Sequence, residues 1–257
     1  PYWVVNRIRS RSLRNRVIAS FTADWKVNGW LRLKARGNVD YVNDKVRQKF
    51  YASTAPALAG ANGRYIESSY SETLFNGEVL AMFDKRLSPD WEFSATAGAG
   101  LNDRTVNSLR IDSKTASLYF PNVFNVANIV MNGSAYVDEQ IDARRQTQSL
   151  FASVEVGWKQ MLYLTVTGRN DWASQLANSP ESSFFYPSVG LSWVPSSTWD
   201  LGKTFSYLKI RGSIASVGMP FPRHLTVPTY EYDATNKVGT ATTHSPIGAL
   251  KPESTIT

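Results

Sequence analysis

Residues 16–41 read RVIASFTADWKVNGWLRLKARGNVDY, and in them apolar and polar side chains alternate along two runs joined by Asn28-Gly29. Asn-Gly between two alternating runs is the strongest short signal for a β-hairpin. The apolar positions are Val17, Ala19, Phe21, Ala23 and Trp25, then Leu31, Leu33, Ala35, Gly37, Val39 and Tyr41. The alternate positions of the second run are Arg32, Lys34, Arg36, Asn38 and Asp40. Such segregation is typical of strands that separate lipid from an aqueous lumen.

Length and composition agree with a membrane β-barrel. The chain has 257 residues, of which 42% are hydrophobic and 19% charged, and its mean hydropathy is −0.28. No apolar stretch reaches the roughly 18 residues of a membrane-spanning helix. The absence of cysteine excludes a disulfide framework and a thiol nucleophile. The first residues lack the basic and apolar regions of a signal peptide, so we expect either a processed start or a fragment.

A formal net charge of +7 raises the question of nucleic-acid binding. Arg32, Lys34 and Arg36 share one strand face, and further arginines from Arg7 to Arg16 are expected to precede the first strand. No helix-turn-helix, zinc-finger or RNA-binding signature accompanies them. The charge therefore favours a lumen wall or a lipopolysaccharide-facing rim, and we predict no nucleic-acid partner.

Three more pairs of alternating runs follow, so the chain is predicted to be all-β, with about eight consecutive strands of an antiparallel transmembrane barrel. The pairs cover residues 73–83 with 91–102, 149–158 with 162–169, and 185–193 with 207–216. The run 73–83 is apolar on both faces in places, which leaves its orientation open.

The connections between strands predict which side of the membrane they face. Those inside a pair are short, whereas those between pairs span Asn43 to Ser69, Asp103 to Gln146 and Ala173 to Phe184. In bacterial outer-membrane barrels the short turns are periplasmic and the long loops extracellular. Four tryptophans beside short turns share the apolar face and predict a periplasmic aromatic girdle: Trp25, Trp91, Trp158 and Trp193. Trp30 also flanks a turn, but in the alternation it falls on the polar face rather than on the apolar face.

Five separated segments resemble the SusC/RagA family of TonB-linked outer-membrane transporters. They are PYWVVNR (1–7), LYLTVTGRNDWASQL (162–176), FFYPSVGLSWV (184–194), LKIRGSIASVG (208–218) and LKPE (250–253). The family's Arg-x-Asp-Trp/Gly-Ser-Ser-like element falls on Arg169, Asp171, Trp172 and Ser174, and its Tyr-Pro-Ser strand on Tyr186, Pro187 and Ser188. Ala173 stands where the family more often has serine.

This resemblance implies a larger protein. Family members are barrels of about 22 strands with an N-terminal plug, so residues 1–257 are expected to be part of the barrel domain, with the plug and the terminal strands absent. The implied activity is import of oligosaccharides or oligopeptides across the bacterial outer membrane. The implied partners are a SusD-like surface lipoprotein, TonB acting through missing parts, and outer-membrane lipid with lipopolysaccharide.

Catalytic groups are sparse, and we predict no enzyme, no metal site and no cofactor. His224 and His244 have no Glu or Cys at metal-ligand spacing, and Arg169 with Asp171 is interpreted as a lumenal ion pair. Substrate or partner contacts are expected from aromatic and amide side chains of the long loops, namely Tyr119, Phe120, Asn122 and Trp172. The apolar stretch 118–122 predicts an ordered loop packed on its neighbours or on the lipoprotein.

Two other interpretations remain open from the sequence. A small passive or structural outer-membrane barrel requires that eight strands close on themselves. A carbohydrate-binding β-sandwich uses the same alternation, but it rarely combines such long strands with such long loops.

Overall fold

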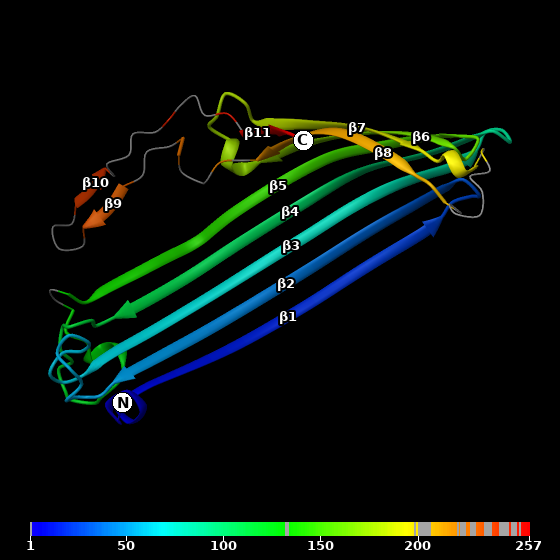
Figure 1. Cartoon of the computed structure of the whole chain (residues 1–257). Helices are drawn as coiled ribbons and strands as arrows, with labels where there is room; N and C mark the ends of the chain where they lie inside the picture. The colour runs from blue at the N-terminus through cyan, green and yellow to red at the C-terminus, as the bar shows by residue number, and fades with distance from the viewer. Residues whose placement is uncertain are drawn as a thin grey trace. The chain divides into compact units, whose positions relative to one another are not determined.

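Long strands dominate the structure, a computed structural model that describes residues 2–131, 134–197, 199, 207–219, 221, 225–226, 230–233, 238–241, 247, 251 and 253–257. A short helix, α1 (Tyr2–Arg7), leads into the strands (Figure 1). These are β1 (Ile8–Lys26), β2 (Leu31–Phe50), β3 (Arg64–Arg86), β4 (Trp91–Asp112), β5 (Tyr136–Trp158), β6 (Leu162–Ala173), β7 (Ser183–Trp193) and β8 (Ile210–Met219). Short 3-10 turns are η1 (Val126–Asn128), η2 (Ser174–Leu176) and η3 (Pro195–Ser197).

The strands form one sheet in chain order from β1 to β8, followed by β11 (Glu253–Ile256). A separate two-stranded sheet contains β9 (Tyr230–Asp233) and β10 (Val238–Ala241). The β5–β6, β6–β7, β7–β8 and β8–β11 pairings are antiparallel. The predicted all-β antiparallel fold is confirmed, and β9 to β11 are additions that the alternation did not reveal. Among the described helices, none has the length and hydropathy needed to cross a bilayer.

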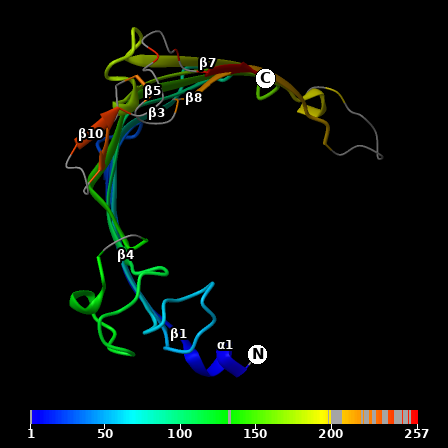
Figure 2. The same cartoon turned by 90° about the vertical axis from the view of Figure 1, so that its left-hand side faces the viewer.

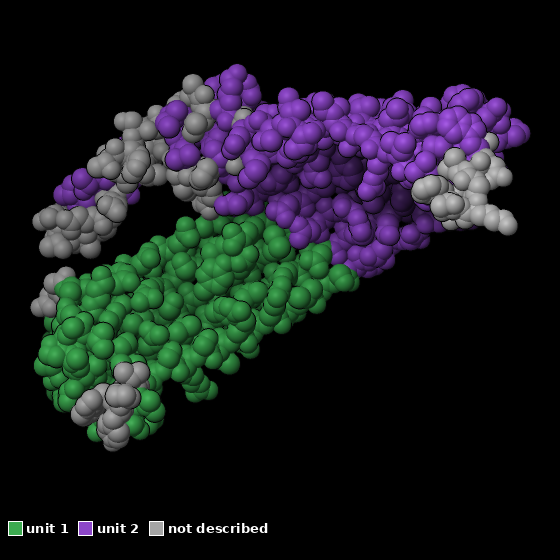
Figure 3. Space-filling model, in the orientation of Figure 1, with its two compact units in different colours: residues 1–20, 38–75, 103–144 green, residues 21–37, 76–102, 145–257 purple. Residues whose placement is uncertain are grey.

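The chain divides into two compact units (Figure 3). Unit 1 contains residues 1–20, 38–75 and 103–144, and unit 2 contains residues 21–37, 76–102 and 145–257. In unit 1 the two long connections, 51–63 and 113–135, follow the ends of their strands near α1 (Figure 2). Unit 2 contains the short turns that begin at Val27 and Leu87.

The strands extend further than predicted. Residues 43–50 belong to β2 and residues 64–69 to β3, although the sequence indicated a loop from Asn43 to Ser69. The predicted loop 103–146 is likewise shortened to 113–135. Of the arginines expected before the first strand, Arg7 does precede it, in α1, whereas Arg9, Arg11, Arg14 and Arg16 lie within β1, which begins at Ile8. Alternation of hydrophobicity ends where both faces of a strand are polar, but the backbone pairing continues.

In unit 2 one face of the sheet is apolar. A shallow groove on this face is lined mainly by Ala23, Trp25, Leu33, Ala35, Val79, Ala81, Ala97, Ala99 and Leu150. This answers the question left open for residues 73–83: Val79 and Ala81 belong to the apolar face. Leu80 lies on the other face, where a Cβ on Gly98 would come within 2.7 Å of the Leu80 side chain and 2.5 Å of the Phe151 ring.

Trp30 joins the aromatic side chains of the turn end. Trp30 precedes β2, so the alternation of side chains along the strand does not determine where its ring points. The Asn28 side chain shapes this turn, because it accepts hydrogen bonds from the N–H groups of Trp30 and Leu31. The Trp30 ring lies 5.0 Å from Phe83, which lies 5.6 Å from Phe93. The geometry of this turn therefore places Trp30 beside Phe83, although its position in the alternation is a polar one.

Candidate functional site

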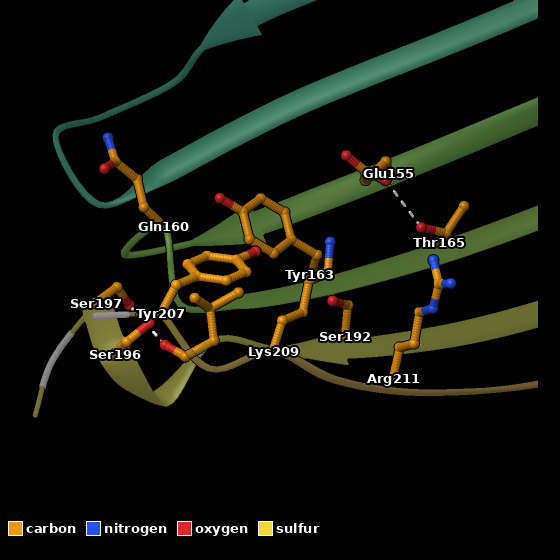
Figure 4. Close-up of a pocket in the computed structure, with 11 residues that line it drawn as sticks. Glu155, Gln160, Tyr163, Thr165, Ser192, Ser196, Ser197, Tyr207, Lys209 and Arg211 are labelled. Atoms are coloured by element: carbon orange, nitrogen blue, oxygen red, sulfur yellow. Dashed lines mark hydrogen bonds between the residues drawn. The ribbon is translucent and has the colours of Figure 1, made fainter. Parts of the chain in front are cut away.

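The polar face of unit 2 has a hollow of about 570 Å³ near the short turns (Figure 4). Strands β5 to β8, the β5–β6 turn and the segments that follow β7 and precede β8 supply its lining: Glu155, Gln160, Tyr163, Thr165, Ser192, Val194, Ser196, Ser197, Tyr207, Lys209 and Arg211. The pairing explains this assembly, because Tyr163 is opposite Ser192 and Ser192 is opposite Arg211. A row of polar side chains therefore crosses three neighbouring strands.

The chemistry of this hollow suits an anion or a hydroxyl-rich ligand. Lys209 and Arg211 have no carboxylate within ion-pair distance among the described residues. Thr165 donates a hydrogen bond to Glu155 over 2.9 Å, whereas the buried hydroxyl of Ser192 has no partner in the described part of the chain. Unused cations and an unused hydroxyl leave donors available for a ligand.

A second hollow, of about 370 Å³, continues this polar surface across β3 and β4. It shares Glu155 and Tyr163 with the first and adds Asp84, Lys85, Arg86, Glu92, Phe93, Ser94 and Gly157. Here Arg86 is already paired, since it donates to Glu92. Unlike Lys209 and Arg211, this guanidinium is therefore not free for a ligand.

Arg169 and Asp171 form the ion pair that the sequence predicted, with 2.8 Å between Nε and Oδ1. Arg169 also donates to the Ser149 hydroxyl, and Tyr186 donates to the Asp171 carboxylate. The guanidinium lies 5.5 Å from the centre of the Phe151 ring. Each hydrogen-bonding partner stands on the neighbouring strand or two residues away, so the cluster ties β5, β6 and β7 together.

The long loops of unit 1 form an ordered cap, as predicted for the apolar stretch. Its core consists of Tyr65, Leu118 and Ile129, with Ile111, Phe124 and Ala135 packed against them. The Asn62 side chain donates to the backbone oxygen of Leu118 over 2.8 Å. The two long connections therefore pack on each other, while Tyr119 and Phe120 remain 62% and 68% exposed.

Asn122 has a structural role that the sequence did not reveal. Its side-chain oxygen accepts the N–H of Ala52 over 2.7 Å, and its backbone N–H donates to the oxygen of Asn62. The residue has a φ of 62°, a left-handed conformation that asparagine tolerates well. Of the predicted contact residues, Tyr119 and Phe120 offer free surface, whereas Asn122 already joins the two loops.

Trp172 is not a loop residue, contrary to the sequence interpretation. It lies in β6, where it is opposite Gln148 of β5 and Ser183 of β7. Counted along β6, Trp172 falls on the same face as Leu162, Leu164 and Val166, which is the face predicted to meet lipid. An amphipathic ring there suits an interfacial aromatic residue, and its contact with a substrate or partner stays a prediction.

Buried charge fixes the end of β4 in unit 1. The Asp112 side chain is 1% exposed and accepts both Nε and Nη2 of Arg64 at 2.8 Å. Arg110 and the N–H of Lys114 donate to the same carboxylate. Burial raises the pKa of Asp112, but these hydrogen bonds outweigh it and hold the pKa below its ordinary value. The carboxylate thus stays charged at the start of the loop.

Tyr65 and Glu67 form a second fixed pair beneath the cap. Burial, with the hydrogen bond that Tyr65 donates to Glu67 over 2.8 Å, raises the pKa of the phenol to about 12. Burial also raises the pKa of Glu67, but hydrogen bonds from Tyr65 and Arg47 and the charges of Arg47 and Lys45 lower it below its usual value. Both groups are structural at neutral pH.

Comparison with known proteins assigns the chain to a family. Residues 1–257 match the family described as TonB dependent receptor-like, beta-barrel. The chain belongs to this family. Its members are transporters and receptors rather than a class of enzymes. His224 and His244 lie outside the described residues, so the absence of a metal site stays a prediction.

Relatives and solved structures agree with this assignment. The chain is 24% identical over 219 residues to the TonB-dependent receptor P26 of Formosa agariphila (strain DSM 15362 / KCTC 12365 / LMG 23005 / KMM 3901 / M-2Alg 35-1), a match covering 81% of this chain and 21% of that protein. Its fold matches the RagAB peptide transporter with a TM-score of 0.83 at 16% identity, covering 99% of this chain and 28% of that one. The RagAB importer in its closed-closed state matches with a TM-score of 0.79 at 16% identity, covering 97% and 28%.

The chain thus spans about a fifth of the length of that receptor and 28% of the RagAB chains. The SusC/RagA resemblance predicted from the sequence is confirmed at the level of family and fold. Lys209, Arg211, Tyr163 and Tyr207 are the site residues that sequence reasoning missed. Aligning neighbouring strands outward from the turns that connect them would have revealed these residues. Such an alignment shows which polar side chains of different strands lie side by side on one face.

Proposed function

We propose that this chain is part of the barrel wall of a SusC-like TonB-dependent transporter that imports oligopeptides or oligosaccharides across the bacterial outer membrane. The match of residues 1–257 to the TonB-dependent receptor barrel family carries the proposal. The solved structures that share its fold are described as a peptide transporter and a peptide importer. Peptide is therefore the first substrate class to test.

The polar face of unit 2 supports a transport role on chemical grounds. Its side chains are hydroxyls, tyrosines and a few unpaired cations, which form and break hydrogen bonds with peptide and sugar groups equally well. Such a surface suits a duct through which ligands pass. On this proposal the face is the lumen and the apolar face meets lipid.

The cap of unit 1 supports a role in capture. Tyr119 and Phe120 present two aromatic rings to solvent from a loop whose backbone is fixed by Asn62, Asn122 and Asn128. Rigid, exposed aromatic side chains stack on sugars and on apolar peptide side chains at small entropic loss. We place this loop outside the cell, where a SusD-like surface lipoprotein is its expected partner.

The test is uptake by the full-length transporter carrying Tyr119→Ala and Phe120→Ala together. We expect import of labelled oligopeptides or oligosaccharides to fall about tenfold, since two stacking contacts are lost, while barrel assembly stays normal on heat-modifiability gels. Leu118→Ala is the matched control for general damage to the cap, because Leu118 is buried beside them. Deletion of residues 117–125 is a poorer test, since it also removes this core residue.

Several outcomes would contradict the proposal. Unchanged uptake and unchanged co-purification of the lipoprotein in the double variant would remove the capture role. Uptake that persists without TonB or without a proton gradient would instead favour a passive barrel. Protease cleavage of the 113–135 loop from the periplasmic side only would reverse the topology.

A further inference from the structure

The hollow of about 570 Å³ on the polar face carries opposite charges at its two sides. Glu155 belongs to β5, whereas Lys209 and Arg211 lie just before β8 and within it (Figure 4). Strands β6 and β7 stand between them, and three strand intervals amount to about 14 Å. Among the described residues, neither the carboxylate nor the two cations has an ion-pair partner. The hollow therefore holds opposite charges that do not neutralise each other.

Opposite charges on adjacent strands of the same face pair directly. Arg36 of β2 donates to Glu78 of β3 over 2.6 Å, and Arg104 of β4 donates to Glu72 of β3 over 2.6 Å. Adjacent strands are about 4.8 Å apart, a distance that these side chains easily span. The unpaired charges of the hollow thus differ from the rest of this face by their separation, and a molecule charged at both ends could bridge them.

Small side chains keep the space between the two sides open. The row across the strands at Glu155 continues with Thr165, Gly190 and Ser213, each opposite the one before. A Cβ on Gly190 would approach no atom more closely than 3.6 Å, so no side chain from β7 stands between Thr165 and Ser213. A ligand can therefore lie across the strands, from β5 to β8.

Tyr163 provides a fixed ring beside this space. A Cβ on Gly157, opposite Tyr163 on β5, would meet the tyrosine ring at 3.0 Å, so the ring lies over the glycine. Tyr207 lines the same hollow. A tyrosine ring offers an apolar surface and a hydroxyl together, which suits the alternating apolar and amide groups of a peptide backbone.

We propose that this hollow binds a short peptide with both ends free, its terminal carboxylate at Lys209 and Arg211 and its terminal ammonium at Glu155. The proposal rests on the proposed function, in which this face lines the import path. Lysine and arginine form charge-assisted hydrogen bonds to carboxylates. Thr165 donates only to Oε2 of Glu155, which leaves Oε1 for the ammonium.

The separation of the charges limits the length of the peptide. An extended chain spans about 3.3–3.6 Å per residue, so roughly two to four residues bridge the hollow once the reach of the side chains is subtracted. A neutral oligosaccharide has no charge for either side. An oligosaccharide of uronic acids has carboxylates but no ammonium, so only the peptide matches both.

The test measures binding to the full-length receptor in detergent by isothermal titration calorimetry. The probe is tetra-alanine, compared with its C-terminal amide and its N-acetyl form. We expect the unmodified peptide to bind about tenfold more tightly than either, since each modified form loses one hydrogen bond between charged groups. Lys209→Gln with Arg211→Gln should abolish the preference for the acid over the amide, and Glu155→Gln should abolish the preference for the free amine.

Two control variants separate a specific site from general charge. Lys26→Gln with Lys34→Gln removes two cations from the same face of β1 and β2, outside the hollow, and should leave the ratio of acid to amide affinity unchanged. Lys209→Arg with Arg211→Lys keeps both charges in the hollow and should retain the preference. Heat-modifiable migration confirms that each variant folds.

Several results would overturn the proposal. Equal binding of acid and amide by the wild type, or an unchanged ratio in Lys209→Gln with Arg211→Gln, would remove the carboxylate site. A lower melting temperature of that variant with the ratio unchanged would assign the cations to a structural ion pair with another part of the receptor. Tighter binding of trigalacturonate than of tetra-alanine would refute the peptide as the source of the carboxylate.

Uptake is measured separately, so the two proposals can fail independently. Loss of peptide import in cells, with the acid preference of the purified receptor intact, would refute only the proposed function. Normal peptide import by a receptor without that preference would refute only the binding of peptide ends in this hollow.

Discussion

Strands β1 to β5 each contribute to both unit 1 and unit 2, yet the faces of the sheet differ in polarity between the two units. In unit 2 one face is a continuous apolar groove and the other is polar. In unit 1 both faces of the β1–β2 hairpin carry charge, with Arg14 and Asp44 on one and Arg11 and Lys45 on the other. Backbone pairing alone therefore does not require an apolar face; lipid contact requires it. On the proposed topology, the contrast marks where the strands leave the membrane.

The largest expected effect concerns the core of the cap in unit 1. Leu118→Ala should destabilise the loops locally by about 2–5 kcal/mol, because the side chain is 1% exposed and its removal leaves a cavity. Limited proteolysis of the receptor in outer-membrane vesicles measures the effect as faster cleavage within 113–135. Phe120→Ala, at an exposed position of the same loop, should change the stability by less than about 0.5 kcal/mol. Equal cleavage of the two variants would show that unit 1 has no core of its own.

Arginine on the apolar face tests the boundary between the units. Leu33→Arg or Ala95→Arg should cost about 2–4 kcal/mol near the bilayer midplane, measured by folding the receptor into lipid vesicles. Asn43→Arg, on the same face of β2 but in unit 1, should be nearly silent, as should Lys34→Gln and Thr96→Gln on the polar face. A large penalty at Asn43 would move the boundary outward, and equal tolerance at Leu33 and Lys34 would refute the assignment of faces.

The smallest effect is electrostatic and confined to unit 1. Hydrogen bonds and charges lower the pKa of Asp112 in the folded state, so its contribution to stability is complete above the unfolded pKa of about 3.9 and is lost as pH falls below about 4. Asp112→Asn should cost about 1.5–3 kcal/mol at neutral pH and should flatten this acid dependence, measured by proteolysis of the loops. Asp44→Asn, in a more exposed pair, should cost less than Asp112→Asn does. An unchanged pH profile in Asp112→Asn would assign the acid sensitivity to another group.

The sequence predicted well wherever lipid constrains it. Alternation located the strands from β1 to β8 and the apolar positions of β2 and β4, because one face must be apolar and the other polar. It failed at residues 43–50 and 64–69, where apolar and polar residues do not alternate regularly and cross-strand pairing is not visible in the pattern. The orientation of β3 also depended on neighbours: Leu80 fits the polar face because Gly98, on the adjacent strand, leaves space for it.

The candidate site was less predictable. Tyr119 and Phe120 are conspicuous in the sequence because they are aromatic residues of a long loop, and their contact with a substrate or partner stays a prediction. The sequence did not show that Asn122 contacts the distant residue Ala52, or that Trp172 lies within β6. Side chains from several neighbouring strands line the hollow around Lys209 and Arg211. The sequence of one strand does not show which residues of its neighbours lie beside it.

On the proposed function, the extension of β4 beyond its apolar residues separates the capture of a nutrient from its passage. From Leu101 to Asp112 the strand runs for about 35 Å, similar to the hydrocarbon thickness of a bilayer. The loop that carries Tyr119 therefore follows β4 only after about one membrane thickness of strand beyond the last residue of the apolar face. On the proposed function, a chemical change at Tyr119 should alter which cargo is accepted without altering how it crosses the membrane.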